Sequence, residues 1–205
     1  MRHEIILFRF TSPVHFGDAA EGGDLGEILS YCRADTFFSA LCREAADISQ
    51  ELLECVVEGV QRGKLRFSDL FPWKKRKNCN ELYLPRPVMN ISHDECGKTL
   101  SYEEVREQSA ERKKEKKRSF IRASEMESYL QGRDISAQPA FGEEEIRTQY
   151  NARERRPYGI GAYHFMPDAG LYLILLGNEE CIARLEPLIT LLGMTGIGGK
   201  RSSGW

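Results

Sequence analysis

The sequence predicts an α+β domain with a long insertion in the middle of the chain. Runs of β-branched and aromatic residues lie near both ends of the 205-residue chain. Amphipathic helical patterns lie beside these runs, and the stretch between about residues 73 and 157 shows neither kind of regularity. The ordered parts follow the order β-α-β-β-α, which is that of a ferredoxin-like (RRM-like) fold without its last strand.

The N-terminal third is predicted to hold two strands and two helices. The expected elements are, in order, a strand at Glu4–Phe10, a loop at Thr11–Arg33, helices at Ala34–Ile48 and Gln50–Gln61, and a strand at Leu65–Leu70. The first strand is apolar on both faces except at Arg9, as a central strand should be. Asp35 is placed to cap the first helix, and Gly63 is a natural stop for the second.

The middle of the chain is predicted to be an insertion that begins after Trp73. The expected contents are a charged helical stretch at Glu103–Lys117, a short helix at Phe120–Leu130 and a polar segment at Gln138–Pro157. About 85 residues are too many for a structureless loop in a compact domain, so the insertion should hold structure of its own.

Regular structure is predicted to return near the C-terminal end. The expected elements are strands at Tyr158–Phe165 and Leu171–Leu176, joined by a turn at Pro167–Gly170, and a helix at Glu180–Leu192. Pro187 predicts a kink in that helix, or a shorter helix that begins near this residue. Gly193 fits the C′ position that follows a helix.

Composition indicates a soluble cytoplasmic protein without membrane contact. The chain is 41% hydrophobic and 29% charged, as globular proteins are, and no apolar run approaches the roughly 20 residues of a membrane span. No secretory signal is apparent, and six scattered cysteines without a Cys-x-x-Cys pair indicate reduced thiols. We expect no cofactor and no metal, because Cys79, His93 and Cys96 are fewer than the four ligands of a structural zinc site.

Charge is unevenly distributed along the chain. Residues 1–70 carry 7 basic and 12 acidic residues (−5), residues 71–118 carry 13 and 8 (+5), and residues 119–205 carry 9 and 11 (−2). The middle part is therefore suited to a polyanion, whereas the N-terminal part could face a basic protein. A protein–protein scaffold without RNA contact is accordingly one open alternative.

The last ten residues have the composition of a phosphate-binding loop. Glycines let backbone N–H groups approach a ligand closely, and adjacent cations and hydroxyls supply bonds to phosphate oxygens. A Walker-type loop would need Ser or Thr where Arg201 stands, so a polymeric phosphate, RNA or DNA, is favoured. A mobile Gly/Ser-rich segment is the alternative. The predicted contacts are Gly196, Gly198, Gly199, Lys200, Arg201, Ser202, Ser203 and Gly204.

Four segments give the chain a family resemblance. They are Pro13–Gly17, Ala34–Leu41, Lys117–Ile121 and Thr195–Trp205, which together span nearly the whole chain. With them the sequence resembles the repeat-associated (RAMP) proteins of CRISPR effector complexes, and among these the Csm subunit that caps the 5′ end of the guide RNA in type III-A complexes. The C-terminal segment is the most specific of the four.

The resemblance implies a non-catalytic RNA-binding subunit. Such proteins bind the repeat-derived 5′ handle of the guide RNA (crRNA), dock beside the large polymerase-like subunit and contact the first backbone RAMP subunit. They typically insert a thumb-like hairpin between guide and target RNA at the first paired position, which here should lie within Trp73–Tyr158. The family continues past the glycine loop into a last strand and a second ferredoxin-like domain, so residues 1–205 are expected to be a fragment, the N-terminal RAMP domain.

Further candidate RNA contacts lie inside and after the insertion. Arg153, Arg155 and Arg156 occupy the place where the family has a guide-facing segment, with a solvated surface as the alternative. Lys117 ends a cationic run that is suited to salt-dependent backbone contact, or is simply a solvated helix face. Phe120 is a candidate for stacking on a base or, equally, a core residue.

His15 leaves one catalytic alternative open. Some RAMP relatives are metal-independent ribonucleases that process guide RNA with a histidine, and histidine can act as a general base at neutral pH. No obvious acid/base partner accompanies His15, so RNA binding is favoured over catalysis and no catalytic residue is predicted.

Overall fold

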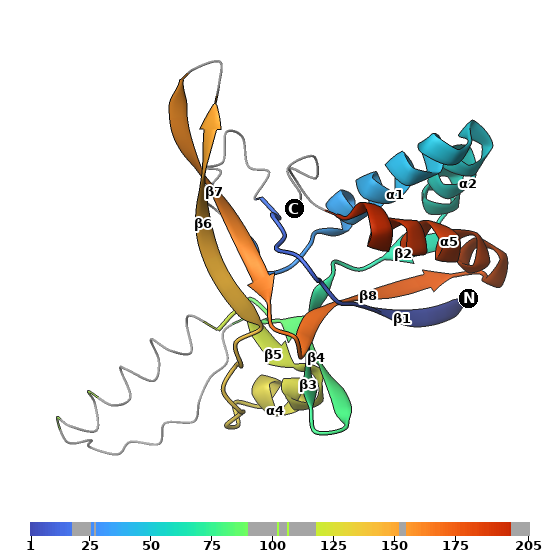
Figure 1. Ribbon diagram of the computed structural model, residues 1–205. Helices are drawn as coiled ribbons and strands as arrows, with labels where there is room; N and C mark the ends of the chain where they lie inside the picture. Colours follow the sequence, from blue (N-terminus) through green and yellow to red (C-terminus); the bar gives the residue numbers. More distant parts are fainter. Residues whose placement is uncertain are drawn as a thin grey trace.

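A layer of helices covers one face of an antiparallel sheet, and a two-stranded hairpin projects from one end of that sheet (Figure 1). The computed structural model describes residues 1–17, 26, 28–89, 102, 106, 118–151 and 155–197. Its strands are β1 (Arg2–Phe8), β2 (Leu65–Phe67), β3 (Phe71–Arg76), β4 (Cys79–Pro85), β5 (Phe120–Arg122), β6 (Gly142–Asn151), β7 (Arg156–Phe165) and β8 (Ala169–Gly177). Its helices are α1 (Ala34–Ile48), α2 (Gln50–Gln61), the 3₁₀ turn η1 (Ala123–Glu125), α4 (Met126–Leu130) and α5 (Glu179–Thr195). The mixed architecture confirms the predicted α+β class.

Strand β8 organises the main sheet, whose order is β1-β8-β3-β4-β5. Strand β1 pairs antiparallel with β8 from Arg2↔Gly177 to Phe8↔Leu171. On the other side of β8, β2 pairs with one end and β3 with the other. Between them, Ser68 still bonds Ile174 through both its N–H (3.0 Å) and its hydroxyl (2.9 Å), so β2 and β3 act as one interrupted strand.

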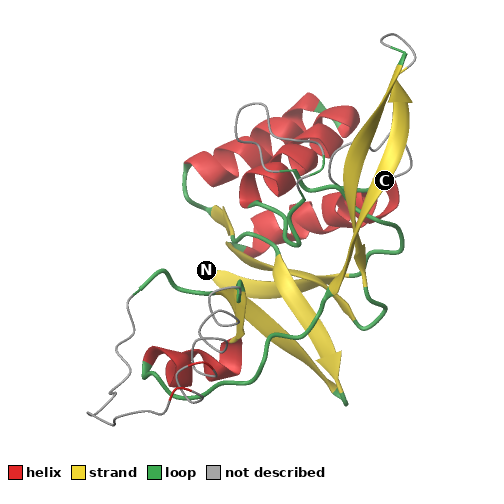
Figure 2. Cartoon of the chain, turned by 90° about the vertical axis from the view of Figure 1, so that its left-hand side faces the viewer, coloured by secondary structure: helices red, strands yellow, loops and turns green. Residues whose placement is uncertain are grey.

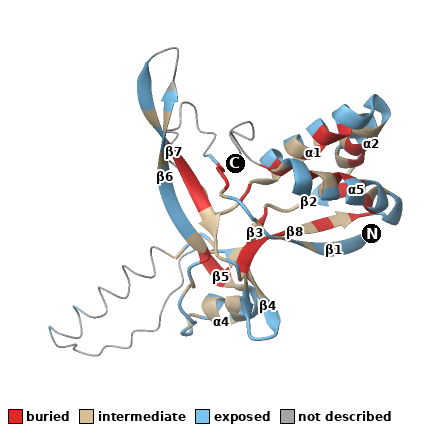
Figure 3. Ribbon diagram, viewed as in Figure 1, coloured by how far each residue is buried: buried red, intermediate tan, exposed pale blue. Residues whose placement is uncertain are grey.

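The main core lies between the sheet and the helices. Alternate residues of a strand point to the same face, and Leu171, Leu173 and Leu175 of β8 all point to the helical side, where none of them is exposed. The helices contribute Phe37, Leu41, Ala45, Val56, Leu185, Leu188 and Leu192 to this core. Figure 3 shows the buried residues following β8 and the inner faces of the helices. No helix among the described residues is long and apolar enough to cross a membrane.

Helix α1 has the predicted bounds but not the predicted cap. Its N-cap is Arg33, whose side chain makes no capping bond. Asp69, which is 35 residues away, accepts a hydrogen bond from the N–H of Ala34 (2.7 Å). Asp35 accepts from the N–H of the next residue, Thr36, instead. The cap therefore comes from tertiary structure that local spacing does not reveal.

Helix α5 runs through the predicted break. Pro187 lies inside a helix of 17 residues, and Gly193, the predicted C′ residue, lies within its last turn. The helix ends at Gly196, which takes a positive φ of 84°. The shorter helix beginning near Pro187 and the C′ position of Gly193 were therefore wrong. The first glycine of the predicted RNA-binding loop is the one that stops the helix.

The insertion contains more strand than its sequence suggests. Strands β3 and β4 form a hairpin with Trp73↔Leu82 in register, and β5 adds to β4. Residues Phe120–Leu130, predicted as one helix, begin with the strand β5 and continue as η1 and α4. Strands β7 and β8 follow each other as predicted, but β7 pairs with β6, whose sequence showed only a polar segment, in a separate two-stranded sheet.

The outer edge of β1 predicts self-association. Among the described strands β1 pairs only with β8, which leaves its other edge with unpaired backbone groups. On the face away from the helices, Ile5 and Leu7 are 51% and 42% exposed. We expect the molar mass from light scattering to rise with concentration, and Ile5→Lys to suppress the rise while Met194→Lys, at an exposed site on α5, does not. A strictly monomeric wild-type sample at high concentration would contradict this expectation.

Candidate nucleic-acid interface

The described structure reaches the beginning of the glycine loop. The N–H of Gly196 donates to the carbonyl of Leu192 (2.9 Å), which closes the last turn of α5. Thr195 donates its hydroxyl proton to the buried carboxylate of Glu44 on α1 (2.9 Å), and Ile197 packs into the main core. The loop therefore leaves the domain from a fixed point. Its predicted contacts Gly198, Gly199, Lys200, Arg201, Ser202, Ser203 and Gly204 lie outside the described residues.

The loop after β1 is attached to β7. Val14 and Tyr163 exchange two backbone hydrogen bonds, of 3.0 and 2.8 Å. Val14, Phe16 and Tyr163 lie in the same core cluster as Ile197. The loop after β1 and the described start of the glycine loop, Ile197, thus both contribute to the main core, although about 180 positions separate them in the sequence.

His15 is a buried, structurally engaged side chain. It is 7% exposed, and its Nδ1 lies 2.8 Å from the carbonyl oxygen of Gly161 on β7. Because a carbonyl oxygen only accepts, we assign the imidazole proton to Nδ1. Within the described part of the chain, no acidic or basic side chain hydrogen-bonds to the ring. This arrangement holds the loop on β7 and does not present the ring to a substrate.

Strands β6 and β7 form a long hairpin that stands away from the main sheet (Figures 1 and 2). Their register runs without a break from Gly142↔Phe165, near the sheet, to Asn151↔Arg156 at the far end. Arg155, with a positive φ of 51°, and Arg156 are exposed at that far end, whereas Arg153 lies outside the described residues. The hairpin thus carries two of the three predicted arginines away from the core.

One face of the hairpin carries a charged network. Oε2 of Glu145 lies 3.0 Å from Nε of Arg147 and 2.7 Å from Nε2 of His164. Hydrogen bonding from Arg147, followed by that from His164, holds the pKa of Glu145 below its ordinary value. The positive charge of Arg147 is therefore matched within the hairpin and is less available to a ligand.

The opposite face carries an exposed apolar pair that the sequence did not point to. Ile146, Thr148 and Tyr150 lie two positions apart on β6 and so share one face, where Ile146 and Tyr150 are 71% and 64% exposed. Gly161 and Gly159 stand opposite Ile146 and Thr148 on β7, so the neighbouring strand adds little side chain to this face. An exposed tyrosine beside terminal arginines is a common platform for an unpaired base. The β-branched and aromatic residues at 146, 148 and 150, each two positions apart, were the available signal.

Phe120 belongs to a second core and not to the surface. It is 4% exposed and packs with Tyr31 and Phe141 at ring-centroid distances of 6.0 and 6.1 Å. A ring that is buried in this way offers no face to a base. Lys117 lies outside the described residues.

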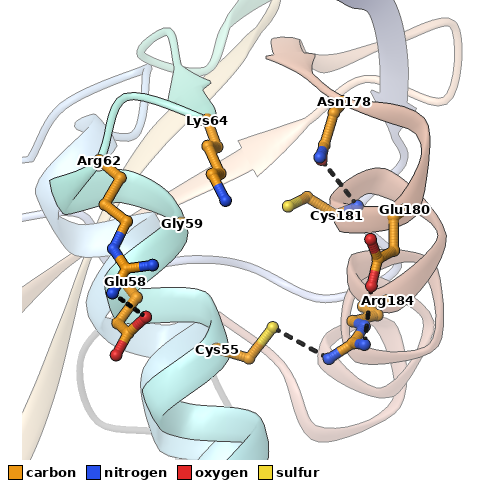
Figure 4. Close-up of a pocket in the computed structure, with 9 residues that line it drawn as sticks. All are labelled: Cys55, Glu58, Gly59, Arg62, Lys64, Asn178, Glu180, Cys181 and Arg184. Carbon is orange, nitrogen blue, oxygen red and sulfur yellow. Dashed lines mark hydrogen bonds and ion pairs between the residues drawn. The ribbon is translucent and has the colours of Figure 1, made fainter.

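A small pocket between α2 and α5 has three cations and two carboxylates in its lining, a net charge of +1. Figure 4 shows Cys55, Lys64 and Cys181 pointing into its space of about 130 Å³. Arg184 donates to the thiol of Cys55 (3.2 Å) and pairs with Glu180 (2.9 Å). The other lining arginine, at position 62, pairs with Glu58. We assign no ligand to this pocket, and the described residues hold no group of three or more metal-ligating side chains.

Curated relatives match the chain along its whole length. The CRISPR system Cms protein Csm4 of Mycobacterium tuberculosis (strain H37Rv) is 31% identical over 210 residues, which cover 97% of this chain and 61% of the relative. The protein of the same name from Streptococcus thermophilus is 26% identical over 205 residues, covering 100% and 62%. The chain thus spans about three fifths of the length of these relatives. No protein-family model matches it.

Solved structures share the fold. A chain in the crystal structure of a Csm1–Csm4 cassette in complex with cA4 superposes with a TM-score of 0.63 at 21% identity, covering 93% of this chain and 65% of that chain. A chain in the Csm3–Csm4 subcomplex of the type III-A CRISPR–Cas interference complex gives a TM-score of 0.56 at 20% identity, covering 97% and 66%.

Proposed function

The chain is a Csm4-type RAMP protein, and from this premise we propose that it is the part of a type III-A CRISPR subunit that holds the 5′ handle of the crRNA. The observation that carries the proposal is that the loop after β1 and the start of the glycine loop are both anchored in the main core, the former by two backbone hydrogen bonds to β7. These are two of the segments that make up the family resemblance. A phosphate-binding loop whose first residues are anchored in the core is suited to holding an RNA end.

We propose that β1, β2 and β8, with α1 and α5 on one face, form three strands and two helices of a ferredoxin-like domain. Both pairings with β8 are antiparallel, which supports this assignment. In the full-length protein, a last strand would pair with the outer edge of β1, and a second ferredoxin-like domain would follow. The relatives are long enough for both, because this chain matches only about three fifths of them.

We propose further that the hairpin of β6 and β7 is the thumb. It projects from the sheet, and most of it falls within Trp73–Tyr158, where the resemblance implies such a hairpin. Its exposed side chains Ile146 and Tyr150 would stand between guide and target RNA at the first paired position, with Arg155 and Arg156 near phosphates.

Csm1-type and Csm3-type subunits are the proposed protein partners. The structural neighbours are a Csm1–Csm4 cassette and a Csm3–Csm4 subcomplex, which supports contacts with a large polymerase-like subunit and with a backbone RAMP subunit. We propose that the chain itself is not a nuclease, because its one candidate base, His15, is buried and bonded to β7.

The first test is a titration of end-labelled handle RNA against a scrambled RNA, at two salt concentrations. We expect wild-type protein to prefer the handle. Lys200→Ala/Arg201→Ala should weaken binding at least about tenfold. It should also lower the slope of log affinity against log salt concentration by the equivalent of up to about two phosphate contacts. The matched control, Arg43→Ala/Arg62→Ala, removes one exposed cation from α1 and one directly after α2, and should bind as wild type does.

The outcomes separate the three hypotheses. Equal affinity for handle and scrambled RNA at physiological salt would reject handle recognition. RNA cleaved without metal, with the cleavage lost in His15→Ala, would establish a ribonuclease instead. The absence of any salt-dependent RNA binding by full-length protein would favour a protein–protein scaffold.

A further inference from the structure

A second pocket, with a cationic lining, lies against strands β3, β4 and β5 of the main sheet, near the base of the hairpin. Its volume is about 320 Å³, and strands β3, β4 and β5 form one wall while residues 136–139 form the other. The lining residues are Lys74, Lys75, Arg76, Glu81, Tyr83, Arg122, Ser136, Ala137 and Pro139. Four cations stand against one carboxylate, which leaves the lining at +3. The pocket between α2 and α5 has no comparable excess of positive charge in its lining.

Strand pairing explains why these cations gather. Lys74 stands directly opposite Glu81, and Tyr83 stands directly opposite Arg122, so the four side chains share one face of the sheet. Arg76, two residues after Lys74, points to the same face. Lys75, between these two residues, is set on the opposite face by the same alternation, although it also borders the pocket.

The innermost cation is incompletely bonded. The side chain of Arg122 is 17% exposed and lies 3.1 Å from Glu81 and 3.4 Å from Glu125. Nevertheless its Nε is buried and makes no hydrogen bond to any described residue, because the oxygen of Glu81 is near but not aligned with the N–H bond. A buried guanidinium N–H without an acceptor is costly, and an anionic oxygen would satisfy it.

The outer cations are the more available ones. Lys74 is held by the carbonyl of Ala140 (2.6 Å) and by Asp168 (3.8 Å). Arg76 is 61% exposed and lies 3.7 Å from Glu81, and the exposed side chain of Lys75 has no hydrogen-bond or ion-pair partner among the described residues. The exposed Arg76 and the two inner cations, Lys74 and Arg122, share one face of the sheet and suit an anion with several oxygens, such as phosphate.

The position of the pocket indicates the source of the phosphate. Lys74 bonds the carbonyl of Ala140, two residues before β6 begins, so the pocket adjoins the base of the proposed thumb. We propose that this pocket binds a backbone phosphate of single-stranded RNA that passes along the hairpin, at a site separate from the glycine loop. This inference rests on the proposed RNA-binding function and adds a second anchoring point to it.

The test compares two charge-reversal variants of equal net charge. Lys75→Glu/Arg76→Glu alters the pocket, whereas Arg43→Glu/Arg66→Glu alters two exposed cations on α1 and β2. The probe is a labelled single-stranded RNA with the handle at its 5′ end, titrated at two salt concentrations. We expect the pocket variant to bind at least about tenfold more weakly, with a salt dependence lower by about two phosphates, and the control to change less than about threefold.

A measurement on unmutated protein locates the contact. Acetylation of surface lysines, followed by mass spectrometry, should show Lys75 protected by the RNA and Lys64 unaffected. Equal binding by the two variants, or no protection of Lys75, would overturn the pocket while leaving handle binding intact. Protection by ATP or inorganic phosphate at lower concentrations than RNA would assign the pocket to a free anion instead. Failure of wild-type protein to bind any RNA would overturn both the pocket and the proposed function.

Discussion

Gly170→Ala is expected to destabilise the fold by about 3 kcal/mol, through overpacking and a lost hydrogen bond. A Cβ atom at position 170 would lie 2.1 Å from the carbonyl oxygen of Phe8 and 2.9 Å from Nε1 of Trp73. The same carbonyl accepts a hydrogen bond from the indole of Trp73 (3.1 Å). Because one obstacle is backbone, no rotamer change relieves the clash. Strand β8 would have to move away from both β1 and β3.

Denaturant unfolding measures this effect, and Gly193→Ala is its matched control. A Cβ atom at position 193 meets nothing within 4 Å, and the residue lies inside α5. Alanine is favoured over glycine there, so this variant should be more stable than wild type by about 0.5–1 kcal/mol. Wild-type stability in Gly170→Ala would show that β8 does not approach β1 as closely as described.

Alkaline conditions are expected to destabilise the protein by several kcal/mol between about pH 9 and pH 12. Burial raises the pKa of Tyr172 and of Tyr163 to about 12 each, and the charge of Glu144 adds to the effect on Tyr163. Burial, with Asp35 and Asp69 nearby, raises the pKa of Cys32 to about 12. The ordinary values are 10.0 for tyrosine and 9.0 for cysteine.

These shifts fix the sign of the pH dependence. In this pH range the unfolded chain releases its protons first, so the folded state binds more protons and its stability falls as pH rises. A two-unit shift corresponds to at most about 2.7 kcal/mol for each tyrosine. Below about pH 9 the contribution is fully present, and it is lost as pH approaches 12.

Urea unfolding at pH 8, 10 and 11.5, together with the absorbance of tyrosinate, tests this expectation. Tyr172→Phe removes one of the titrating groups and should reduce the alkaline loss. At pH 8 it should cost about 1 kcal/mol, because the hydroxyl of Tyr172 donates to the carbonyl of Tyr83 (2.9 Å). A free energy of unfolding that does not change from pH 8 to pH 11.5 would show that these side chains are accessible to water.

The elements that the sequence predicted well are those whose hydrophobic pattern faces the main core. Helices α1 and α2 have the predicted bounds, because apolar residues at helical spacing face the sheet and Gly63, with φ of 67°, follows α2. Strand β8 contains the predicted Leu171–Leu176, because it is apolar on both faces. Strand β1 was placed two residues too late, since Arg9 and Phe10 continue the same composition.

The missed elements are held by contacts that are distant in sequence. Strand β6 reads as polar, because it pairs with β7 away from the main core and most of its residues face water. Strand β3 contains Pro72 and three cations, a composition typical of a loop, yet Pro72 and Trp73 are both buried against β8. Neither partner strand is identifiable from local pattern alone.

The candidate site was predictable in composition but not in arrangement. Composition and the family resemblance identified the glycine loop and the segment around His15, and the structure anchors the described part of each in the main core. The sequence did not reveal that His15 bonds Gly161, that Phe120 is buried, or that Tyr150 is exposed. Those facts depend on which strand lies beside which, and two of the strands concerned were not predicted.

The pairing of β1 with β8 also constrains synthesis on the ribosome. Arg2 pairs with Gly177, 175 positions later in the chain, and among the described strands β1 and β2 both pair only with β8. At roughly 5–20 residues per second, translation takes on the order of ten seconds or more to supply that partner. During this interval the apolar strand β1 has been synthesised but its partner β8 has not. The nascent chain should therefore depend on chaperones until β8 has emerged.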